Sequence, residues 1–543
     1  MLIRFEIGDW LKNASIVGIY KVLMKAQKKI DDIKVANNYI EFDDSLLENF
    51  AENYFETITD EYRNELTYFK IVDKDIEHLS TLEEINGFID FVKVKLTSES
   101  FISAYNLANR NELVDKFKNI KKVMVKKNFT DEEKEELIKK AKTELEEIQE
   151  ILSDKTIKKY ITAKNCMYQV IKNFYSDKSF LNSKNKDEDM IMLYKKDFVD
   201  RALAYQSVDK KKFKLNCCCC DELINSNTKT KFSWLNEQGI DSDKKTNYFW
   251  DGYVDLYMCD ACVLLYSCAC LGFNKKYNKA IFINNNRSAN DLIQTNIVKV
   301  VDKNNISNVT AMTYFNVLKY MQINEISSNK FVMENIQVVK MDTDNSRLFE
   351  FSILTKNLLK LLYYNRKDLE RISTRFIKVT DNYTLDVFTE VMNNLYLNKC
   401  LYGLVDTIFY FYFKDLDKNK CNVSMNTIEI IQRIEGGKRM KKSELESSKL
   451  LGKELGTELM RKGLDSKLST LNYRLLNSLR TNDSNRFIDT ILDIHIYLRK
   501  NIHTDILQIK QNDTKLKDFG YAYLVGLNSV KSSGIKEGNK DEE

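Results

Sequence analysis

Two cysteine-rich stretches decide how this chain folds: 216-NCCCCDELINSNTKTKFSW-234 and 258-MCDACVLLYSCACLGF-273. They hold eight of its eleven cysteines. Cys217 and Cys220 form one Cys-x-x-Cys pair, and Cys259 and Cys262 form a second. At this spacing one turn can aim two thiolates at a single ion, and two such turns complete a tetrahedral zinc site. The sequence therefore predicts a zinc ion held by these four cysteines.

The sequence alone leaves open other interpretations of these cysteines. An iron–sulfur cluster uses the same ligands, and the thiols could also be buried without metal. Within the first run, Cys218 or Cys219 could replace one of the predicted ligands. Cys268 and Cys270 lie in an apolar run, so we interpret them as core residues. Four thiolate ligands leave no open coordination position, which makes the predicted site structural rather than catalytic.

The composition describes a globular protein with several domains. A chain of 543 residues with 43% hydrophobic and 30% charged residues is too long for a single core. The longest dense apolar run, at 404–413, is about half the length of a membrane span, so no membrane contact is expected. The N-terminus lacks an apolar signal, which predicts a cytoplasmic protein. In that reducing compartment, clustered thiols are more often metal ligands than disulfides.

The periodicity of apolar residues predicts a mostly helical α+β fold with several domains. Strands are expected at 2–7 and 38–44, and a helix follows Asp9. Thr130 and Glu133 form a capping box at the start of a long charged helix. The chain contains no proline, so helix ends must rely on Gly, Asn and Asp. The expected divisions are an α+β and helical domain at 1–205, a zinc-binding module at 206–287, a helical middle region at 288–420, a C-terminal helical bundle at 421–530 and a disordered tail at 531–543.

No sequence pattern predicts catalysis. The three histidines, His78, His495 and His503, are not in a metal-binding spacing or beside a nucleophile motif. A phosphate-binding Walker A motif is also missing. We therefore expect that the protein is not an enzyme.

Four stretches of the sequence, in order, resemble the CXXC-CXXC family of CRISPR-associated proteins, which form the large subunit of the type I-B Cascade effector complex. They are 9-DWLKNASIVGIYKVL-23, the two cysteine pairs with Tyr-Phe-Trp between them, the second cysteine stretch with 281-IFINNNRSANDL-292, and the late segment 468–498. The family usually has proline before the Gly-Phe that ends the second stretch, where this chain has Leu271. This difference affects the expected loop geometry and leaves the expected fold unchanged.

The resemblance implies a non-catalytic subunit of an RNA-guided surveillance complex. Its partners would be other Cascade subunits, crRNA, double-stranded target DNA and a recruited helicase-nuclease. Such a subunit senses a short adjacent motif on the DNA and stabilises the opened strands. The alternatives are a free-standing zinc-containing nucleic-acid-binding regulator or adaptor, and a nuclease that needs a divalent metal.

Two groups of residues are candidates for DNA contact. The amides of Asn284, Asn285 and Asn286 could read base edges in a groove, although an Asn run after a strand is also typical of a turn. The side chains of Lys211, Lys212 and Lys214 could bind phosphates. The net charge of +5 is compatible with a polyanionic partner.

Overall fold

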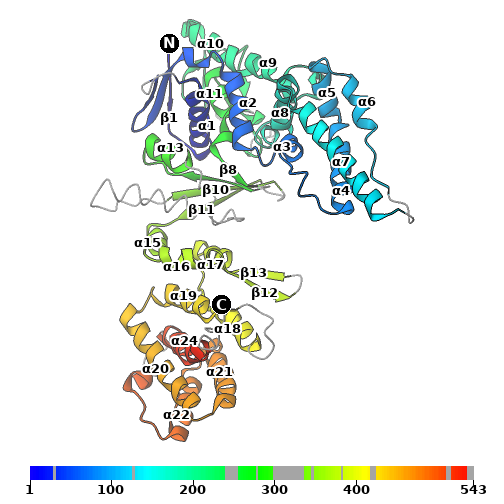
Figure 1. Cartoon of the computed structure of the whole chain (residues 1–543). Helices are drawn as coiled ribbons and strands as arrows, with labels where there is room; N and C mark the ends of the chain where they lie inside the picture. Colours follow the sequence, from blue (N-terminus) through cyan, green and yellow to red (C-terminus); the bar gives the residue numbers. More distant parts are fainter. Residues whose placement is uncertain are drawn as a thin grey trace. The chain divides into compact units, whose positions relative to one another are not determined.

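The chain forms two compact units, shown in Figure 1. The first unit takes its residues from 1–299 and 336–352, and the second includes 353–543. Both consist mainly of helices with small sheets, which confirms the predicted mostly helical α+β fold. Among the described residues, no helix is both long and apolar enough to cross a membrane. The computed structural model describes residues 1–27, 32–124, 129–238, 255–276, 279–297, 336–343, 348–380, 383–415, 423–508 and 515–534.

A three-stranded antiparallel sheet begins the first unit. β3 (Tyr39–Asp43) lies in its centre, between β1 (Leu2–Glu6) and β2 (Ile33–Val35). Successive side chains of a strand point to opposite faces, and here Ile3 and Phe5 are buried while their neighbours are exposed. Both strands predicted from the sequence are therefore confirmed.

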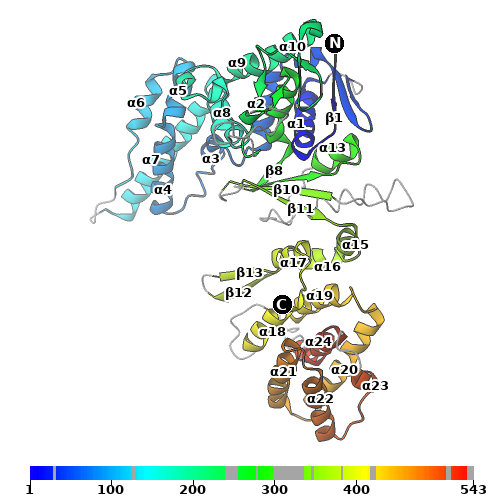
Figure 2. The same ribbon diagram turned by 180° about the vertical axis from the view of Figure 1, so that it is seen from behind.

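Helices make up most of the rest of this N-terminal part. The long charged helix α7 begins at the predicted capping box: Glu133 N donates to Thr130 Oγ1 at 3.3 Å, and Thr130 N donates to Glu133 Oε2 at 2.8 Å. Figures 1 and 2 show α4, α5, α6 and α7 together at one side of the unit. The helices are α1 (Trp10–Ala26), α2 (Phe50–Glu61), α3 (Thr67–Val72), α4 (Leu82–Leu96), α5 (Glu99–Leu107), α6 (Glu112–Lys118), α7 (Asp131–Leu152), α8 (Lys155–Gln169), α9 (Met190–Tyr194) and α10 (Asp200–Ser207).

The cysteine-rich region and the segment after it complete the first unit. Two short hairpins, β4–β5 and β6–β7, precede two apolar helices, and a four-stranded sheet of order β11-β10-β9-β8 follows. The elements are β4 (Leu215–Asn216), β5 (Leu223–Ile224), β6 (Thr230–Lys231), β7 (Tyr257–Met258), α11 (Asp260–Ser267), α12 (Ala269–Gly272), β8 (Asn274–Lys276), β9 (Lys279–Asn284), α13 (Ala289–Ile297), β10 (Ile336–Asp342) and β11 (Phe349–Leu354).

The cysteine-rich region shares its core with the N-terminal part, so the predicted boundary between 205 and 206 does not separate two cores. One cluster of buried side chains extends from Ile3 to Met341 and includes α11 and α12. A helix that is apolar all round needs neighbours on every side, and α11 finds them in α1 and α10. The boundary predicted between 287 and 288 also falls between packed elements, because Asn296 of α13 accepts a hydrogen bond from Ile283 N of β9 at 3.1 Å.

Helix α1 is the centre of the first unit. The Asp9 side chain caps it by accepting hydrogen bonds from the backbone N–H groups of Leu11 and Lys12, at 2.8 and 3.1 Å. Its side chains are buried on nearly all sides, against α2, α11, α12 and α13. The helix predicted after Asp9 is therefore confirmed, and it is a core helix.

Helices α1 and α12 touch through their backbones. A Cβ at Gly18 would lie 1.9 Å from the carbonyl oxygen of Cys268, and a Cβ at Gly272 would lie 2.1 Å from that of Ala14. Side chains larger than glycine cannot occupy these two positions without moving one helix away from the other. This contact fixes the cysteine-rich region against the N-terminal helix.

The second unit begins with two helices and a hairpin and ends in a bundle of helices. Helices predominate among the described residues of the predicted helical middle region, 288–420, but this hairpin and strands β10 and β11 lie in it as well. These strands were not predicted from the sequence, because short alternating segments such as Phe376–Thr380 carry too weak a signal to distinguish from helix. The elements are α15 (Lys356–Tyr364), α16 (Arg366–Ile372), β12 (Phe376–Thr380), β13 (Tyr383–Asp386), α17 (Val387–Tyr396), α18 (Tyr402–Asp415), α19 (Met425–Gly436), α20 (Lys442–Arg461), α21 (Asp465–Arg480), α22 (Ser484–Leu498), α23 (Thr504–Gln508) and α24 (Leu516–Gly534).

The last helix, α24, is the central helix of this bundle and packs against α19, α20 and α21. A Cβ at Gly526 would lie 1.9 Å from the carbonyl oxygen of Lys449, so α24 and α20 are also in backbone contact. The buried amides of Asn472 and Asn528 exchange two hydrogen bonds, at 2.7 and 2.9 Å. Because α24 extends to residue 534, the tail predicted as disordered from 531 overlaps a helix, and its remainder lies outside the described residues.

Several helices end at asparagine, as expected for a chain without proline. Asn109, Asn398 and Asn482 have φ angles of 54°, 51° and 56° just after α5, α17 and α21. Asparagine tolerates this left-handed conformation better than most residues, because its short amide can hydrogen-bond locally.

The contact between α1 and α12 predicts that Gly18→Ala destabilises the protein. The added methyl group must displace the α12 backbone, which should lower the free energy of unfolding by about 2–3 kcal/mol in urea denaturation. The matched control is Gly87→Ala in α4, where a Cβ meets nothing within 4 Å. That substitution should raise the free energy of unfolding by up to about 1 kcal/mol. Equal effects of the two substitutions would contradict the proposed packing role of Gly18.

Candidate metal centre

The first cysteine pair lies on the turn between β4 and β5. Cys217 N donates to Glu222 O at 2.8 Å, and Asp221 N donates to Cys217 O at 2.9 Å, so the chain folds tightly back on itself. Asp221 has a φ of 59°, a left-handed conformation that lets the strand β5 begin directly after the turn. The turn therefore presents Cys217 and Cys220 on the same side.

The second pair lies where β7 runs into α11. Cys259 is the N-cap residue of this helix, and its sulfur accepts a hydrogen bond from Cys262 N at 3.4 Å. A hydrogen bond of 2.9 Å from Cys218 N to Tyr257 O joins the first turn to β7. Local backbone geometry thus brings the two pairs together from segments about 40 residues apart.

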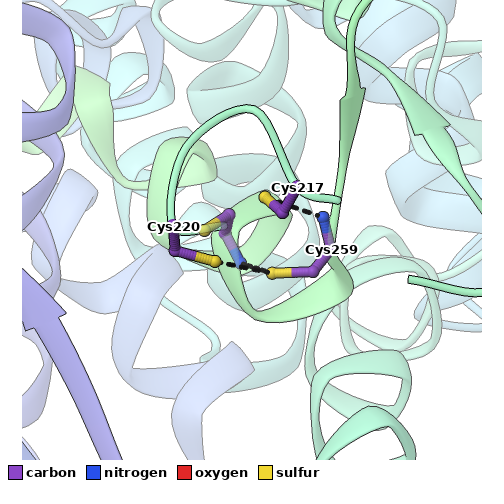
Figure 3. Close-up of side chains that lie close together, drawn as sticks. Cys217, Cys220 and Cys259 are labelled. Atoms are coloured by element: carbon purple, nitrogen blue, oxygen red, sulfur yellow. Dashed lines mark hydrogen bonds between the residues drawn. The ribbon is translucent and has the colours of Figure 1, made fainter. Parts of the chain in front are cut away.

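The four sulfurs of Cys217, Cys220, Cys259 and Cys262 lie within 4.8 Å of one another. Cys220 Sγ and Cys259 Sγ are 3.6 Å apart, and Figure 3 shows these two sulfurs facing each other, with the side chain of Cys217 close by. Zinc–sulfur bonds of about 2.3 Å in a tetrahedron place sulfurs about 3.8 Å apart. The cluster therefore has the dimensions of a four-thiolate metal site, with Cys217 and Cys220 as the pair from the first run.

Backbone amides and a helix end favour negative charge at this site. Cys217 Sγ accepts hydrogen bonds from Cys259 N at 3.2 Å and from Cys219 N at 3.5 Å. Hydrogen bonds from Cys219 and from the other clustered cysteines hold the pKa of the Cys217 thiol far below its ordinary value. The positive end of the α11 dipole lies at Cys259 and Cys262. Such surroundings stabilise the thiolate of Cys217, the form that binds a metal ion.

The cluster can hold a soft metal ion and leaves it no reactive position. Four thiolates suit zinc or iron, and a closed tetrahedral shell has no place for substrate or water. Cys217, Cys259 and Cys262 are 0, 2 and 1% exposed, whereas Cys220 lies at the surface. An ion bound here would tie the β4–β5 turn to α11.

The remaining cysteines of the second stretch belong to the core, as interpreted from the sequence. Cys268 and Cys270 are completely buried, and burial raises the pKa of the Cys270 thiol to about 12. The hydroxyl of Tyr54 approaches Cys270 Sγ at 3.5 Å and donates to Ser267 O at 2.8 Å. These two cysteines pack beneath aromatic rings, away from the cluster.

The predicted phosphate-binding lysines lie on the surface just before the first cysteine pair. Lys211 and Lys212 belong to a short 3-10 turn, Lys210–Lys212, and Lys214 follows it. All three of the predicted lysines are exposed. Lys211 forms an ion pair with Asp209 that is long, at 3.8 Å, and open to solvent. The structure thus places the three lysines together, where a large anion could reach them.

The predicted base-reading asparagines are mostly inside the protein. Asn284 and Asn285 are 8 and 4% exposed, and Asn286 is exposed. Asn284 Oδ1 accepts a hydrogen bond from Asn13 Nδ2 at 2.8 Å, while its own Nδ2 donates to Gln337 Oε1 at 2.9 Å. The amide of Asn284 is therefore engaged within the fold, and Asn286 is the member of the triplet that a partner could reach.

Sequence reasoning missed the role of Asn13. This fully buried residue of α1 donates to Asn284 and Asn286 and accepts from Gly8 N at 2.8 Å, so it joins the N-terminus to the asparagine loop. A polar side chain in the first turn of an otherwise apolar helix was the available signal, because buried amides need partners.

Comparison with known proteins supports the resemblance over the cysteine-rich region. A family model described as CRISPR-associated protein (Cas_CXXC_CXXC) matches residues 210–274, which include both cysteine pairs. No curated protein and no solved structure was found to match the chain. The chain thus carries a cysteine-rich region of the CRISPR-associated CXXC-CXXC type.

The geometry of the cluster predicts that Cys259→Ser removes both metal and stability. Cys259 supplies a sulfur and caps α11, so elemental analysis should find well below one metal ion per chain, and thermal unfolding should begin at a lower temperature. As a control, Cys268→Ala should keep the metal content of the unchanged protein, because Cys268 lies outside the cluster. An unchanged protein that contains no metal would refute the site.

Proposed function

We propose that this protein is a non-catalytic subunit of a CRISPR RNA-guided surveillance complex, the large subunit of a type I-B Cascade. The observation that carries the proposal is the family match at 210–274 on a cluster of four cysteines with metal-site dimensions. Its proposed partners are the other Cascade subunits with crRNA, double-stranded target DNA and a helicase-nuclease. In such a complex, RNA pairing reads the sequence while the protein senses a short adjacent motif.

The proposed role of the metal is structural, and the proposed metal is zinc. Four thiolates and no open position are typical of structural zinc sites. The ion would hold the β4–β5 turn, and with it the surface that carries Lys211, Lys212 and Lys214, against a buried helix. A rigid support of this kind limits the entropy lost when the surface binds a phosphate backbone.

The proposed DNA contacts are made by the positive charges of three lysines and by the side-chain amide of one asparagine. The three exposed lysines would neutralise phosphates and release counterions, which contributes to affinity for any sequence. Asn286 is the candidate for contact with a base edge.

In the C-terminal bundle, Arg439 contacts Asp518 at 2.8 Å and Arg461 contacts Glu458 at 2.7 Å. Because these two arginines already pair within the chain, they are weaker candidates for DNA contact.

Assembly distinguishes this proposal from a free-standing nucleic-acid-binding regulator. When the protein is mixed with crRNA and the other Cascade subunits, size-exclusion chromatography should show one large complex. A control RNA of equal length without the crRNA repeat should leave the protein in its own peak. A protein that stays separate and binds duplex DNA with sequence preference would instead be a regulator. Cleavage of DNA by the isolated chain with Mg²⁺ would contradict the non-catalytic role.

Charge reversal at Lys211, Lys212 and Lys214 should weaken DNA binding by the assembled complex. The loss should be similar on targets with correct and with scrambled adjacent motifs, and log Kd should depend less steeply on log salt concentration. The matched control reverses three exposed lysines of α8, Lys155, Lys158 and Lys159, which changes the net charge equally. If both triple variants lose the same affinity, the effect comes from net charge, and the predicted phosphate site is refuted.

A further inference from the structure

A cavity of about 420 Å³ lies in the first unit, where α8 ends. It is lined by Tyr168 of α8 and by residues of the segment that follows, 172–182. Ligand-binding cavities in proteins usually measure about 300–1,000 Å³. The cavity is therefore large enough to hold a small organic ligand.

The segment that forms the cavity wall is held in place on both sides of a sharp turn. On one side, Ser176 N donates to Trp234 O at 3.0 Å. On the other, Asp197 Oδ2 accepts hydrogen bonds from Ser179 N and Ser179 Oγ, at 3.0 and 2.6 Å. Between them, Asp177 has a φ of 59°, a left-handed conformation that turns the chain sharply. The cavity thus has a fixed wall before any ligand binds.

Lys178, which lines this cavity, is a buried lysine without an anionic partner. It is 8% exposed, and its Nζ lies 4.7 and 5.2 Å from the ring centroids of Trp234 and Phe198. Among the residues that the structure describes, none forms an ion pair or a hydrogen bond with this ammonium group. Burial lowers the pKa of Lys178 to about 8, and the carboxylates of Asp197 and Asp260 act on it only at longer range. Because a buried charge is costly without a partner, an anion in the cavity would stabilise this group.

Lys164 shows how another buried lysine of this unit is accommodated. It is 1% exposed, and burial lowers its pKa to about 8 as well. Its ammonium group donates a hydrogen bond to the carbonyl oxygen of Lys186. Lys178 is similarly buried but has no such bond, so its ammonium group remains available to a ligand.

Other side chains of the cavity add donors and an aromatic surface. The ammonium group of Lys172, the hydroxyl of Ser176 and the amide nitrogen of Asn182 form no hydrogen bond with any described residue. Asp177 is the single carboxylate among the described lining residues. The side chain of Tyr168 is 41% exposed. With Lys178, the cavity therefore offers two positive charges against one negative charge, neutral donors and an accessible ring.

We propose that this cavity binds a nucleotide, with its phosphate at Lys172 and Lys178 and its base against the ring of Tyr168. A phosphate is the anion that suits two lysines with hydroxyl and amide donors beside them. The flexible side chain of Lys178 lets its ammonium group turn from the two aromatic rings to the phosphate. Every base has a face that stacks on an aromatic ring, so the site does not select one base.

The nucleotide is either a free molecule or an unpaired unit of a nucleic-acid strand. The site uses none of the residues of the metal centre and none of the lysines and asparagines proposed to contact DNA. The nucleotide site can therefore fail while the proposed function stands, and the reverse.

Isothermal titration calorimetry of the full chain tests the site with thymidine monophosphate, inorganic phosphate and an oligothymidine strand. We expect the monophosphate or the strand to bind at least about fivefold more tightly than inorganic phosphate, because the base stacks on Tyr168. Binding of the monophosphate assigns the site to free nucleotides, and binding of the strand alone assigns it to a nucleic-acid strand. If neither binds, or if inorganic phosphate binds equally well, the proposal is wrong.

Substitutions of the two lysines locate the binding at this cavity. Lys178→Met and Lys172→Met should each weaken nucleotide binding by about tenfold or more, because each removes a charged hydrogen bond to the phosphate. Tyr168→Leu should abolish the preference for the nucleotide over inorganic phosphate. Circular dichroism checks that each variant is folded.

Each lysine substitution has a matched control. Lys164→Met removes a similarly buried charge, and Lys184→Met removes an exposed charge outside the lining of the cavity. Both controls should keep the affinity of the unchanged protein. Equal losses in Lys172→Met and Lys184→Met would overturn the proposal, and so would unchanged affinity in Lys172→Met, even if Lys178→Met failed to fold.

Discussion

The backbone contact between α1 and α12, made possible by Gly18 and Gly272, positions the rest of the first unit. Cys268 both ends α11 and begins α12, so the position of α12 also fixes the start of α11. The two cysteines at that start are fixed with it, and the hydrogen bond from Cys218 N to Tyr257 O then places the first pair opposite them. A metal ion bound there would join surface turns to a core that helix packing has already ordered.

Charge balance explains why the cluster lies at a helix end. Four thiolates around a divalent cation carry a net charge of about −2, which is costly to bury without compensation. The N-terminus of α11 and the amides of Cys219, Cys259 and Cys262 supply partial positive charge. Hydrogen bonds to a charged acceptor contribute about 1.5–3 kcal/mol each. The ammonium group of Lys12 adds a full positive charge close to the β4–β5 turn.

The sequence predicted local features better than boundaries. The two Cys-x-x-Cys pairs, the strands around Phe5 and Ile40 and the cap at Thr130 depend on neighbours in the chain, so local patterns reveal them. The core shared by α1 and α11 depends on contacts between segments that are far apart in the sequence. Local sequence patterns therefore do not predict this shared core. For the same reason, the asparagine run was visible as a loop, but the burial of Asn284 by Asn13 was not. The sequence predicted Cys220 as a ligand, with Cys218 or Cys219 as alternatives, and the shape of the turn brings the sulfur of Cys220 into the cluster.

The long-range contacts of α1 have a consequence for the order of synthesis. Asn13 and its partner Asn284 are separated by 271 residues, and the partners of Gly18 lie at a similar distance. A ribosome adding about 5–20 residues per second needs on the order of tens of seconds to make that interval. During this time an apolar helix that is buried on nearly all sides in the finished protein has α2 beside it but lacks its partners in α11, α12 and α13. The nascent chain should therefore depend on chaperones that shield residues 10–26 until the second cysteine stretch emerges.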